Sequence, residues 1–156
     1  MCIRDSLEEA LNHAARRGTI IAAAAGNQRT IGSSPITRHG WVIPVAACDH
    51  RGQPLDASNF SASIGRQGLR APGESVSSLA AGGTTMTSSG TSAATPFVTG
   101  TAALLCSAFP GATGAEIKRA MTHANASARS TIVPPLLDAW AAYQFLAAGE
   151  VSRRRT

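Results

Sequence analysis

Aromatic and charged residues are both scarce in this chain of 156 residues, at 4% and 15% of the sequence. The net charge of +5 comes from 13 arginines and one lysine. Most of these side chains are scattered along the sequence, and only Arg16-Arg17 and the terminal Arg153-Arg154-Arg155 form clusters. A nucleic-acid-binding surface combines a basic face with interleaved aromatic residues. We therefore expect no nucleic-acid partner.

Cysteines, acidic loops and long apolar runs are also few. The three cysteines imply no disulfide framework, and Cys48 and Cys106 lie in apolar runs where cysteine behaves as a small buried hydrophobe. No apolar run approaches the ~18 residues of a transmembrane helix, so we expect no membrane span. No Asp-rich loop of the calcium-binding type occurs, so we expect no metal or other cofactor within this chain.

The two ends of the sequence differ from what lies between them. Residues 1–6 lack the apolar core of a signal peptide and look unrelated to the following sequence. We expect them to be a non-native or truncated start, with the true start upstream, which leaves the localisation open. We expect residues 150–156 to form a disordered basic tail.

The hydrophobic content of 44% is sufficient for a globular core, and its pattern predicts an α/β fold. Apolar residues at helical spacing predict a helix over 7–17 with Ser6 as its cap. The uninterrupted apolar run 19–25 predicts a strand buried on both faces of a parallel sheet. Segment 41–48 predicts a second core strand, in which Pro44 indicates an edge or a bulge.

The second half of the chain alternates short extended segments with helices. A capping box of Thr113 and Glu116 begins one predicted helix, and Asp138 caps another that ends at Gly149. The remaining predicted segments are short strands at 58–61, 69–74 and 76–79, a loop at 80–89, and helices at 113–121 and 139–148.

The stretch from Ser88 to Leu105 changes from a polar, glycine-rich loop to a nearly uncharged run of Ala, Val, Leu and Thr. This change predicts the start of a buried helix, with Ser92 at its amino end. Free backbone N–H groups and the positive end of the helix dipole would then surround the hydroxyl. Ser92 is therefore a candidate nucleophile, although a serine at this position can also be a simple N-cap.

Three neighbours of Ser92 fit the same interpretation. Gly90 permits a close approach of backbone or substrate, and Gly100 permits another element to pack against the helix. Pro96 lies near the predicted helix start, where its missing N–H costs least.

Asn27 directly follows the predicted strand 19–25. Ligands bind beyond the carboxyl ends of strands in open α/β sheets, so Asn27 is placed to face a site. The pair Gly26-Asn27 could equally be an ordinary turn.

Two motifs together resemble those of a known family. Gly-Thr-Ser-Ala-Ala-Thr-Pro at 90–96, followed by Phe-Val-Thr-Gly-x-Ala-Ala-Leu-Leu, resembles the nucleophile segment of the subtilisin-like serine proteases, the subtilases or peptidase family S8. Ala-Ala-Ala-Gly-Asn at 23–27 is similar to the subtilase strand whose terminal asparagine donates its amide to the oxyanion. The residues around Ser92 and the Ala-Pro-Gly-Glu segment at 71–74 look most like the branch of the subtilases that matures ribosomally made cyclic peptides.

The resemblance implies a fold, a reaction and a set of site residues. The fold would be the three-layer subtilisin-like domain with a mostly parallel sheet, of which residues 7–149 form the C-terminal part. The reaction would be hydrolysis of a peptide or protein by a serine endopeptidase, with Ser92 as nucleophile and Asn27 in the oxyanion hole. The substrate-binding residues would be Ala24, Ala25, Gly26, Gly90 and Thr91.

The catalytic base and its carboxylate partner are not among the matched motifs. In subtilases the chain order is Asp, His, Ser, so we expect the first two in missing upstream sequence and expect this chain alone to be inactive. The histidines here lack the neighbours of the family's histidine motif; they are His13, His39, His50 and His123. Calcium is possible in the complete protein.

Two other interpretations stay open. One is a sedolisin-type acid peptidase, a relative that has aspartate where this chain has Asn27. The other is a subtilase-like domain that has lost its base and serves as a binding or structural module.

Overall fold

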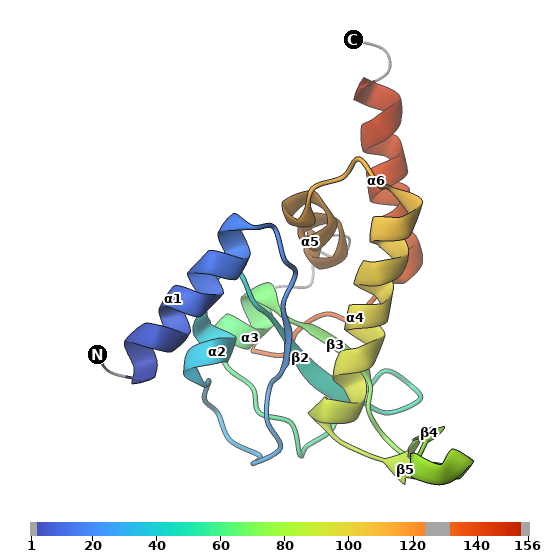
Figure 1. The fold of residues 1–156 in the computed structure, drawn as a ribbon. Helices are drawn as coiled ribbons and strands as arrows, with labels where there is room; N and C mark the ends of the chain where they lie inside the picture. The colour runs from blue at the N-terminus through green and yellow to red at the C-terminus, as the bar shows by residue number, and fades with distance from the viewer. Residues whose placement is uncertain (1–2, 124–131, 154–156) are drawn as a thin grey trace.

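The computed structural model describes residues 3–123 and 132–153 and contains a three-stranded parallel sheet of order β1-β2-β3. Each of its strands follows a helix in the sequence (Figure 1). The elements up to the end of this sheet are α1 (Ile3–Arg16), β1 (Ala22–Ala24), α2 (Pro35–Arg38), β2 (Ile43–Cys48), α3 (Ala62–Gln67) and β3 (Leu69–Pro72). The remaining elements are β4 (Val76–Leu79), a 3₁₀ turn at Ala81–Gly83, β5 (Thr85–Ser88), α4 (Thr91–Ala108), α5 (Gly114–His123) and α6 (Ala139–Arg153). The predicted α/β class with a mostly parallel sheet is confirmed.

The central strand β2 organises the core. All six of its residues are buried, and side chains alternate between the two faces of the sheet. Ile43 and Val45 pack in one cluster with Val98 of α4, whereas helix α3 packs against β2 from the other side. The sheet therefore lies between two helical layers, and α4 crosses all three strands.

Strand β1 is shorter and less buried than the predicted strand 19–25. Ala22 and Ala23 are half-buried and Ala24 is exposed, so burial on both faces is wrong for the described part of the chain. The reason is that β1 lies at the edge of the sheet and pairs with β2 alone. An apolar strand with an open edge would gain stability from a further partner.

Pro44 lies in the central strand, contrary to the predicted edge or bulge. The N–H of Ile43 donates to Ile21 on the β1 side, so the missing N–H of Pro44 faces the β3 side. The pairing of β2 with β3 begins one residue later, at Val45 and Leu69. No ladder hydrogen bond is lost, because β3 has not yet begun opposite Pro44.

Several predicted helix ends can be compared with the structure. The Thr113–Glu116 capping box and the Asp138 cap are confirmed, with Ala141 N–H donating to Asp138 Oδ1 over 2.8 Å. Ser6 is no cap, because α1 begins at Ile3. Helix α6 also continues through Gly149 to Arg153, within the predicted tail 150–156, of which 154–156 lie outside the described residues.

The predicted loop 80–89 is largely a β-hairpin. Strands β4 and β5 pair antiparallel through Val76–Ser88 and Leu79–Thr85 and project from the body of the protein (Figure 1). Segment 58–61, predicted as a strand, forms only an isolated bridge between Ile31 and Phe60.

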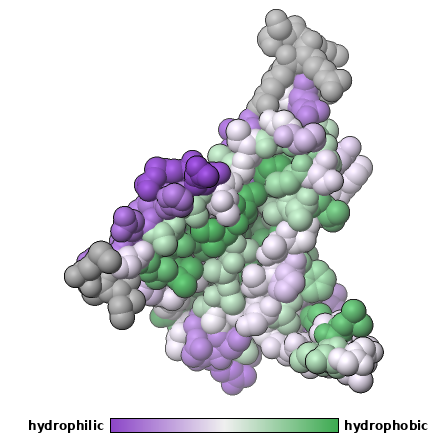
Figure 2. Space-filling model, viewed as in Figure 1, coloured by the Kyte–Doolittle hydropathy of each residue, from purple (hydrophilic) through white to green (hydrophobic). Residues whose placement is uncertain are grey.

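The surface carries large apolar side chains. Leu104 is 71% exposed and Phe97 42% exposed on one side of α4, and Cys106 of the same helix is exposed rather than buried as expected. Figure 2 shows a band of hydrophobic residues between α1 and α4 in the orientation of Figure 1. In the described part of the chain, no helix is long and apolar enough to cross a membrane. Among the described residues, the edge of β1 that faces away from β2 pairs with no strand.

Candidate active site

Two hydrogen bonds join the segment after β1 to the amino end of α4, across more than 60 residues of sequence. The N–H of Thr91 donates to Asn27 Oδ1 over 2.9 Å, and the N–H of Gly26 donates to Thr91 Oγ1 over 3.2 Å. Thr91 is fully buried. The sheet and the helix therefore meet at a fixed distance at the carboxyl edge of the strands.

This contact also orients the Asn27 amide. A backbone N–H needs an acceptor, so the oxygen of the amide faces Thr91 and the NH₂ group faces away from it. The NH₂ group keeps its donors for another partner. Asn27 is exposed, so these donors can reach a bound molecule.

Asn59 holds the segment that carries Asn27. Its Oδ1 accepts the N–H groups of Gln28 and Thr30 over 2.9 and 3.2 Å, and its own N–H donates to the Gly26 carbonyl over 2.9 Å. The sequence analysis missed this role, because it interpreted Ser-Asn-Phe-Ser as a strand. The signal was an asparagine between hydrophobic segments, a residue type that bonds readily to nearby backbone.

Gly90 is required by two features of this site. Its φ is +112°, in a region that residues with a Cβ rarely adopt. A Cβ there would also lie 3.0 Å from both the oxygen and the nitrogen of the Asn27 amide. The predicted close approach at Gly90 is therefore to a side chain of the protein itself.

Ser92 is exposed and is the second residue of α4, as the change in composition predicted. The N–H groups of the first helical turn have no intrahelical acceptors. Those of Ala93 and Ala94 donate to the Gly90 carbonyl, while that of Thr91 is taken by Asn27. The hydroxyl thus lies in the positive field of the helix amino end.

Pro96 lies inside α4 and not at its first turn, which corrects the expected position. At this position an N–H would donate to the carbonyl four residues earlier, which is that of Ser92. Nearby hydroxyls keep other carbonyls paired: Thr95 Oγ1 donates to the Thr91 carbonyl over 2.8 Å, and Thr101 Oγ1 donates to the Phe97 carbonyl over 2.9 Å.

Ser92 lines an apolar groove of about 610 Å³ between α4 and the β4–β5 hairpin. Among the described residues that line it, none is a histidine or a carboxylate. Gly100 lines the same groove, and no described atom would lie within 4 Å of a Cβ there. The lining residues are Val76, Ser78, Ser88, Ser89, Ser92, Ala93, Pro96, Phe97, Gly100, Thr101 and Leu104.

The predicted substrate-binding residues differ in exposure. Ala24 is exposed and Gly26 is half-buried, with φ +105°, whereas Ala25 is only 4% exposed. The Ala25 side chain therefore belongs to the interior. The structure brings Gly26, Gly90 and Thr91 together around Asn27, with Ala24 on the strand that leads to them.

Other reactive groups lie in different surroundings. Burial raises the pKa of the Cys48 thiol, and this outweighs the opposing effect of Arg70, so the thiol is a poor nucleophile.

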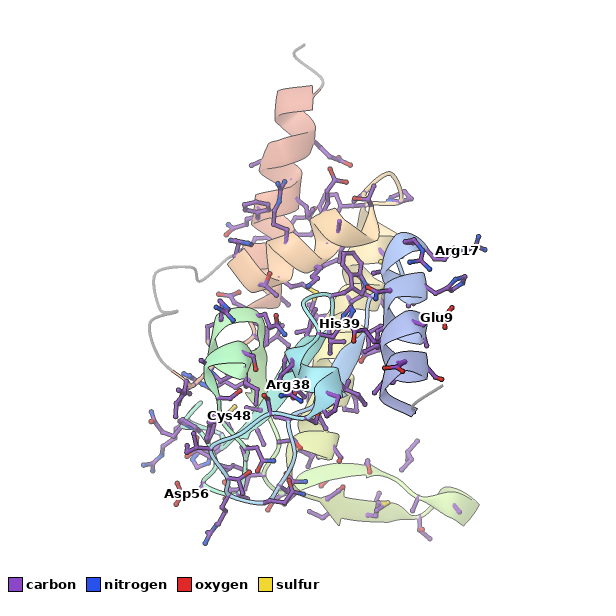
Figure 3. The ribbon with its side chains drawn as sticks, turned by 90° about the vertical axis from the view of Figure 1, so that its left-hand side faces the viewer. Glu9, Arg17, Arg38, His39, Cys48 and Asp56 are labelled. Atoms are coloured by element: carbon purple, nitrogen blue, oxygen red, sulfur yellow. The ribbon has the colours of Figure 1, made fainter. Side chains whose placement is uncertain are left out.

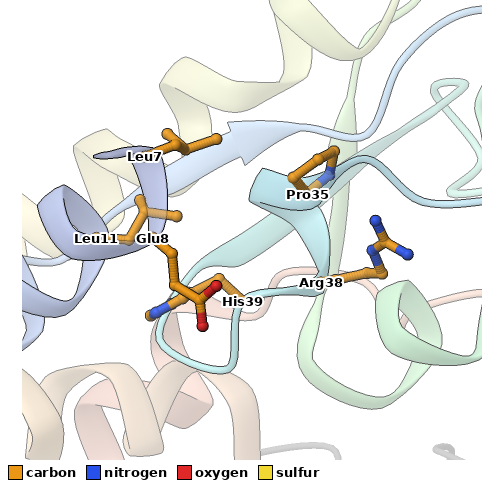
Figure 4. Close-up of a pocket in the computed structure, with 6 residues that line it drawn as sticks. All are labelled: Leu7, Glu8, Leu11, Pro35, Arg38 and His39. Atoms are coloured by element: carbon orange, nitrogen blue, oxygen red, sulfur yellow. The ribbon is translucent and has the colours of Figure 1, made fainter. Parts of the chain in front are cut away.

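His39 and Cys48 lie near opposite ends of β2 (Figure 3). His39 lines a separate pocket of about 310 Å³ between α1 and α2, with its ring near Glu8 (Figure 4). Its Nδ1 accepts the Trp41 N–H over 3.2 Å, and its Nε2 contacts Asn12 Oδ1 over 3.3 Å, which indicates a structural role.

A serine hydroxyl at a helix amino end beside a side-chain amide places a possible nucleophile next to donors that can stabilise an oxyanion. The model of the subtilase family matches residues 3–139, and the chain belongs to this family.

Individual relatives agree with the family assignment. The chain is 38% identical over 114 residues to a thermostable alkaline protease of Halalkalibacterium halodurans, covering 73% of this chain and 31% of that protein. It is 32% identical over 126 residues to subtilisin BL of Lederbergia lenta, covering 81% of this chain and 46% of that protein. This chain thus spans less than half the length of either relative.

Solved structures extend the similarity to three dimensions. An S218A mutant of the protease domain of PatA matches with a TM-score of 0.83 and 32% identity, over 92% of this chain and 54% of that one. The prenylagaramide maturation protease PagA matches with a TM-score of 0.81 and 30% identity, over 90% and 55%. The predicted subtilisin-like fold is confirmed.

Replacement of Gly90 by alanine tests the packing of the site. We expect Gly90→Ala to lower the stability of the complete protein by about 1–3 kcal/mol, because the new Cβ meets the Asn27 amide at an unfavourable φ. Urea unfolding measures this change. Gly100→Ala is the matched control, since a Cβ there meets no described atom. Equal effects of the two substitutions would contradict the packing described here.

Proposed function

We propose that the complete protein containing this chain is a serine endopeptidase, with Ser92 as its nucleophile and Asn27 as a donor in its oxyanion hole. The observation that carries the proposal is the hydrogen bond between Thr91 N–H and Asn27 Oδ1. This bond fixes an amide donor beside the helix end that bears an exposed serine. Family membership supports the same reaction class.

The proposed reaction begins with attack by Ser92 Oγ on the carbonyl carbon of the peptide bond, while a base takes the hydroxyl proton. The carbonyl oxygen becomes negative, and the Asn27 NH₂ group and the Ser92 N–H stabilise it, since the N–H groups of Thr91, Ala93 and Ala94 already donate to the protein. Return of the proton to the departing amine leaves an acyl-enzyme. Water then hydrolyses this ester by the reverse sequence of proton transfers, and no step requires a cofactor.

We infer that the base and the carboxylate that orients it lie outside this chain. The groove beside Ser92 has no titratable residue among its described lining residues, and the chain spans only part of the length of its relatives.

The sedolisin alternative is less favoured because those enzymes have aspartate at the position of Asn27. An inactive binding module is less favoured because Ser92 and Asn27 are both retained. Calcium, if present, would belong to the rest of the protein.

The substrate we propose is an extended peptide whose residue before the scissile bond lies near Ala24 and Gly26, while the side chain of Ala25 between them points into the interior. Small side chains on this strand leave room for a medium or large apolar group. Two structural neighbours are named as maturation proteases, of patellamide and of prenylagaramide. These names support a ribosomally made precursor peptide as the natural substrate.

The role of Ser92 is tested with a fluorophosphonate probe, which modifies activated serines. The complete protein should be labelled at Ser92 and should lose both labelling and peptide hydrolysis in Ser92→Ala. Ser78→Ala is the control, because Ser78 lines the same groove from β4 and has no proposed part in catalysis. Undiminished labelling of Ser92→Ala would contradict the assignment. The 156-residue chain by itself should show no protease-like turnover, because it lacks the base.

The proposed specificity is tested by the cleavage profile of the complete protein on a peptide library. We expect apolar residues, medium or large, immediately before the cleaved bond, because the strand offers space and no charge. A requirement for arginine or aspartate at that position would overturn this part of the proposal.

A further inference from the structure

Three side chains that the proposed hydrolysis does not use meet beyond the carboxyl ends of β2 and β3. Asp49, His50 and Glu74 each offer one ligand atom, and these atoms all lie within 4.8 Å of one another. We propose that they bind a divalent transition metal ion of the zinc class. The proposal goes beyond the proposed function and does not depend on it.

The backbone places the three residues together before any metal binds. Asp49 directly follows β2, and Glu74 lies two residues beyond the end of β3. The two strands remain joined at this end, because the N–H of Gly73 donates to the Cys48 carbonyl over 2.9 Å. The separation between the Asp49-His50 turn and Glu74 is therefore set by the sheet.

Asp49 is also held in a defined orientation. One carboxylate oxygen accepts the N–H groups of Arg51 and Gln53 over 2.8 and 2.7 Å, which fixes the turn that carries His50. A carboxylate has a second oxygen that can bind a cation. The nearby Arg70 directs Nε and Nη1 to the carbonyls of Gly52 and Pro134, and so is engaged with backbone.

The donor set determines the class of metal. An imidazole nitrogen combined with carboxylates suits Zn²⁺, Co²⁺ or Ni²⁺, whereas Ca²⁺ and Mg²⁺ prefer oxygen ligands alone. Zinc ligands lie about 2.0–2.2 Å from the ion, so they are less than about 4.4 Å apart. The ligand atoms of the three side chains lie within 4.8 Å of one another, so modest rotation of these side chains brings them to the separation that zinc requires. Two carboxylates balance the charge of the ion, and its remaining positions face water.

The position of Glu74 links this site to the segment before the nucleophile. The N–H of Gly90 donates to the Gly73 carbonyl over 2.7 Å, and the N–H of Ser75 donates to Ser89 Oγ over 2.9 Å. Glu74 lies between these two anchoring residues. A metal ion on Glu74 would therefore restrain Ser89 and Gly90, which immediately precede α4.

The sequence analysis predicted no metal site in this chain because it looked for ligands clustered in one loop. Asp49-His50 and Glu74 are separated by α3 and β3, so only the pairing of β2 with β3 brings them together.

The site is tested by titrating Zn²⁺ into the complete protein and measuring binding by isothermal calorimetry. A Ser92→Ala background prevents self-cleavage and makes the readout independent of proteolysis. We expect His50→Gln and Glu74→Gln each to weaken one binding event at least about 10-fold, since even residues that only orient metal ligands have effects of that size. His13→Gln on α1, an exposed histidine remote in sequence from the cluster, should leave binding unchanged.

Hydrogen exchange gives a second readout. Zinc should slow exchange of the Ser75 and Gly90 amides in the parent protein and not in His50→Gln. The proposal is overturned if the parent protein binds no zinc, or if both ligand variants bind as tightly as the His13→Gln control.

Discussion

The hydrogen bond from the Thr91 N–H to Asn27 Oδ1 is the interaction on which the organisation of the site depends. It joins two segments that the sheet alone would leave independent, the carboxyl end of an edge strand and the amino end of the helix that crosses the sheet. It also uses the oxygen of the amide, and so directs the NH₂ donors away from the helix. The buried Thr91 returns a second bond by accepting the Gly26 N–H, which makes the junction reciprocal.

The requirements of this junction extend into the surrounding loops. Gly90 has no side chain because Asn27 occupies the space where a Cβ would lie. Asn59 accepts the amides of Gln28 and Thr30, and it thereby adds to the backbone hydrogen bonds that hold the segment after β1. The carbonyl of Gly73 accepts the Gly90 N–H and ties the same site to the end of β3. Four segments from different parts of the sequence thus converge on a few polar contacts at one edge of the sheet.

The sequence predicted those parts of the structure that depend on local pattern. The buried strand at 43–48, the helix beginning at Thr91 and the caps at Thr113 and Asp138 all follow from composition and short-range hydrogen bonding. Strand β4 coincides with the predicted strand 76–79, but β5 and the continuation of α6 past Gly149 were missed, because local propensity favoured a loop and a helix end there. The position of Pro44 depends on where β3 begins, which is a property of strand pairing and cannot be seen in one segment.

The candidate site shows the same division. Ser92 and Asn27 became candidates because each stands at the end of a regular element, and the family resemblance related them to each other. Asn59 was missed because its partners lie about 30 residues earlier in the sequence. Cys106 was expected to be buried because it lies in an apolar run, but its side chain is exposed on α4 among the described residues.

The central claim is that Asn27 and the amino end of α4 act as one unit through Thr91, and a double-mutant cycle in the complete protein tests it most directly. Asn27→Ala should lower kcat by about 10²–10³-fold with little change in KM, the size of loss seen when an oxyanion-hole donor is removed from subtilisin. Thr91→Val removes the hydroxyl that accepts the Gly26 N–H, and it should cost much less in the Asn27→Ala background than in the parent protein. Non-additive losses of this kind would support the account. Losses in kcat/KM that simply multiply, or an Asn27→Ala variant that changes KM alone, would contradict it.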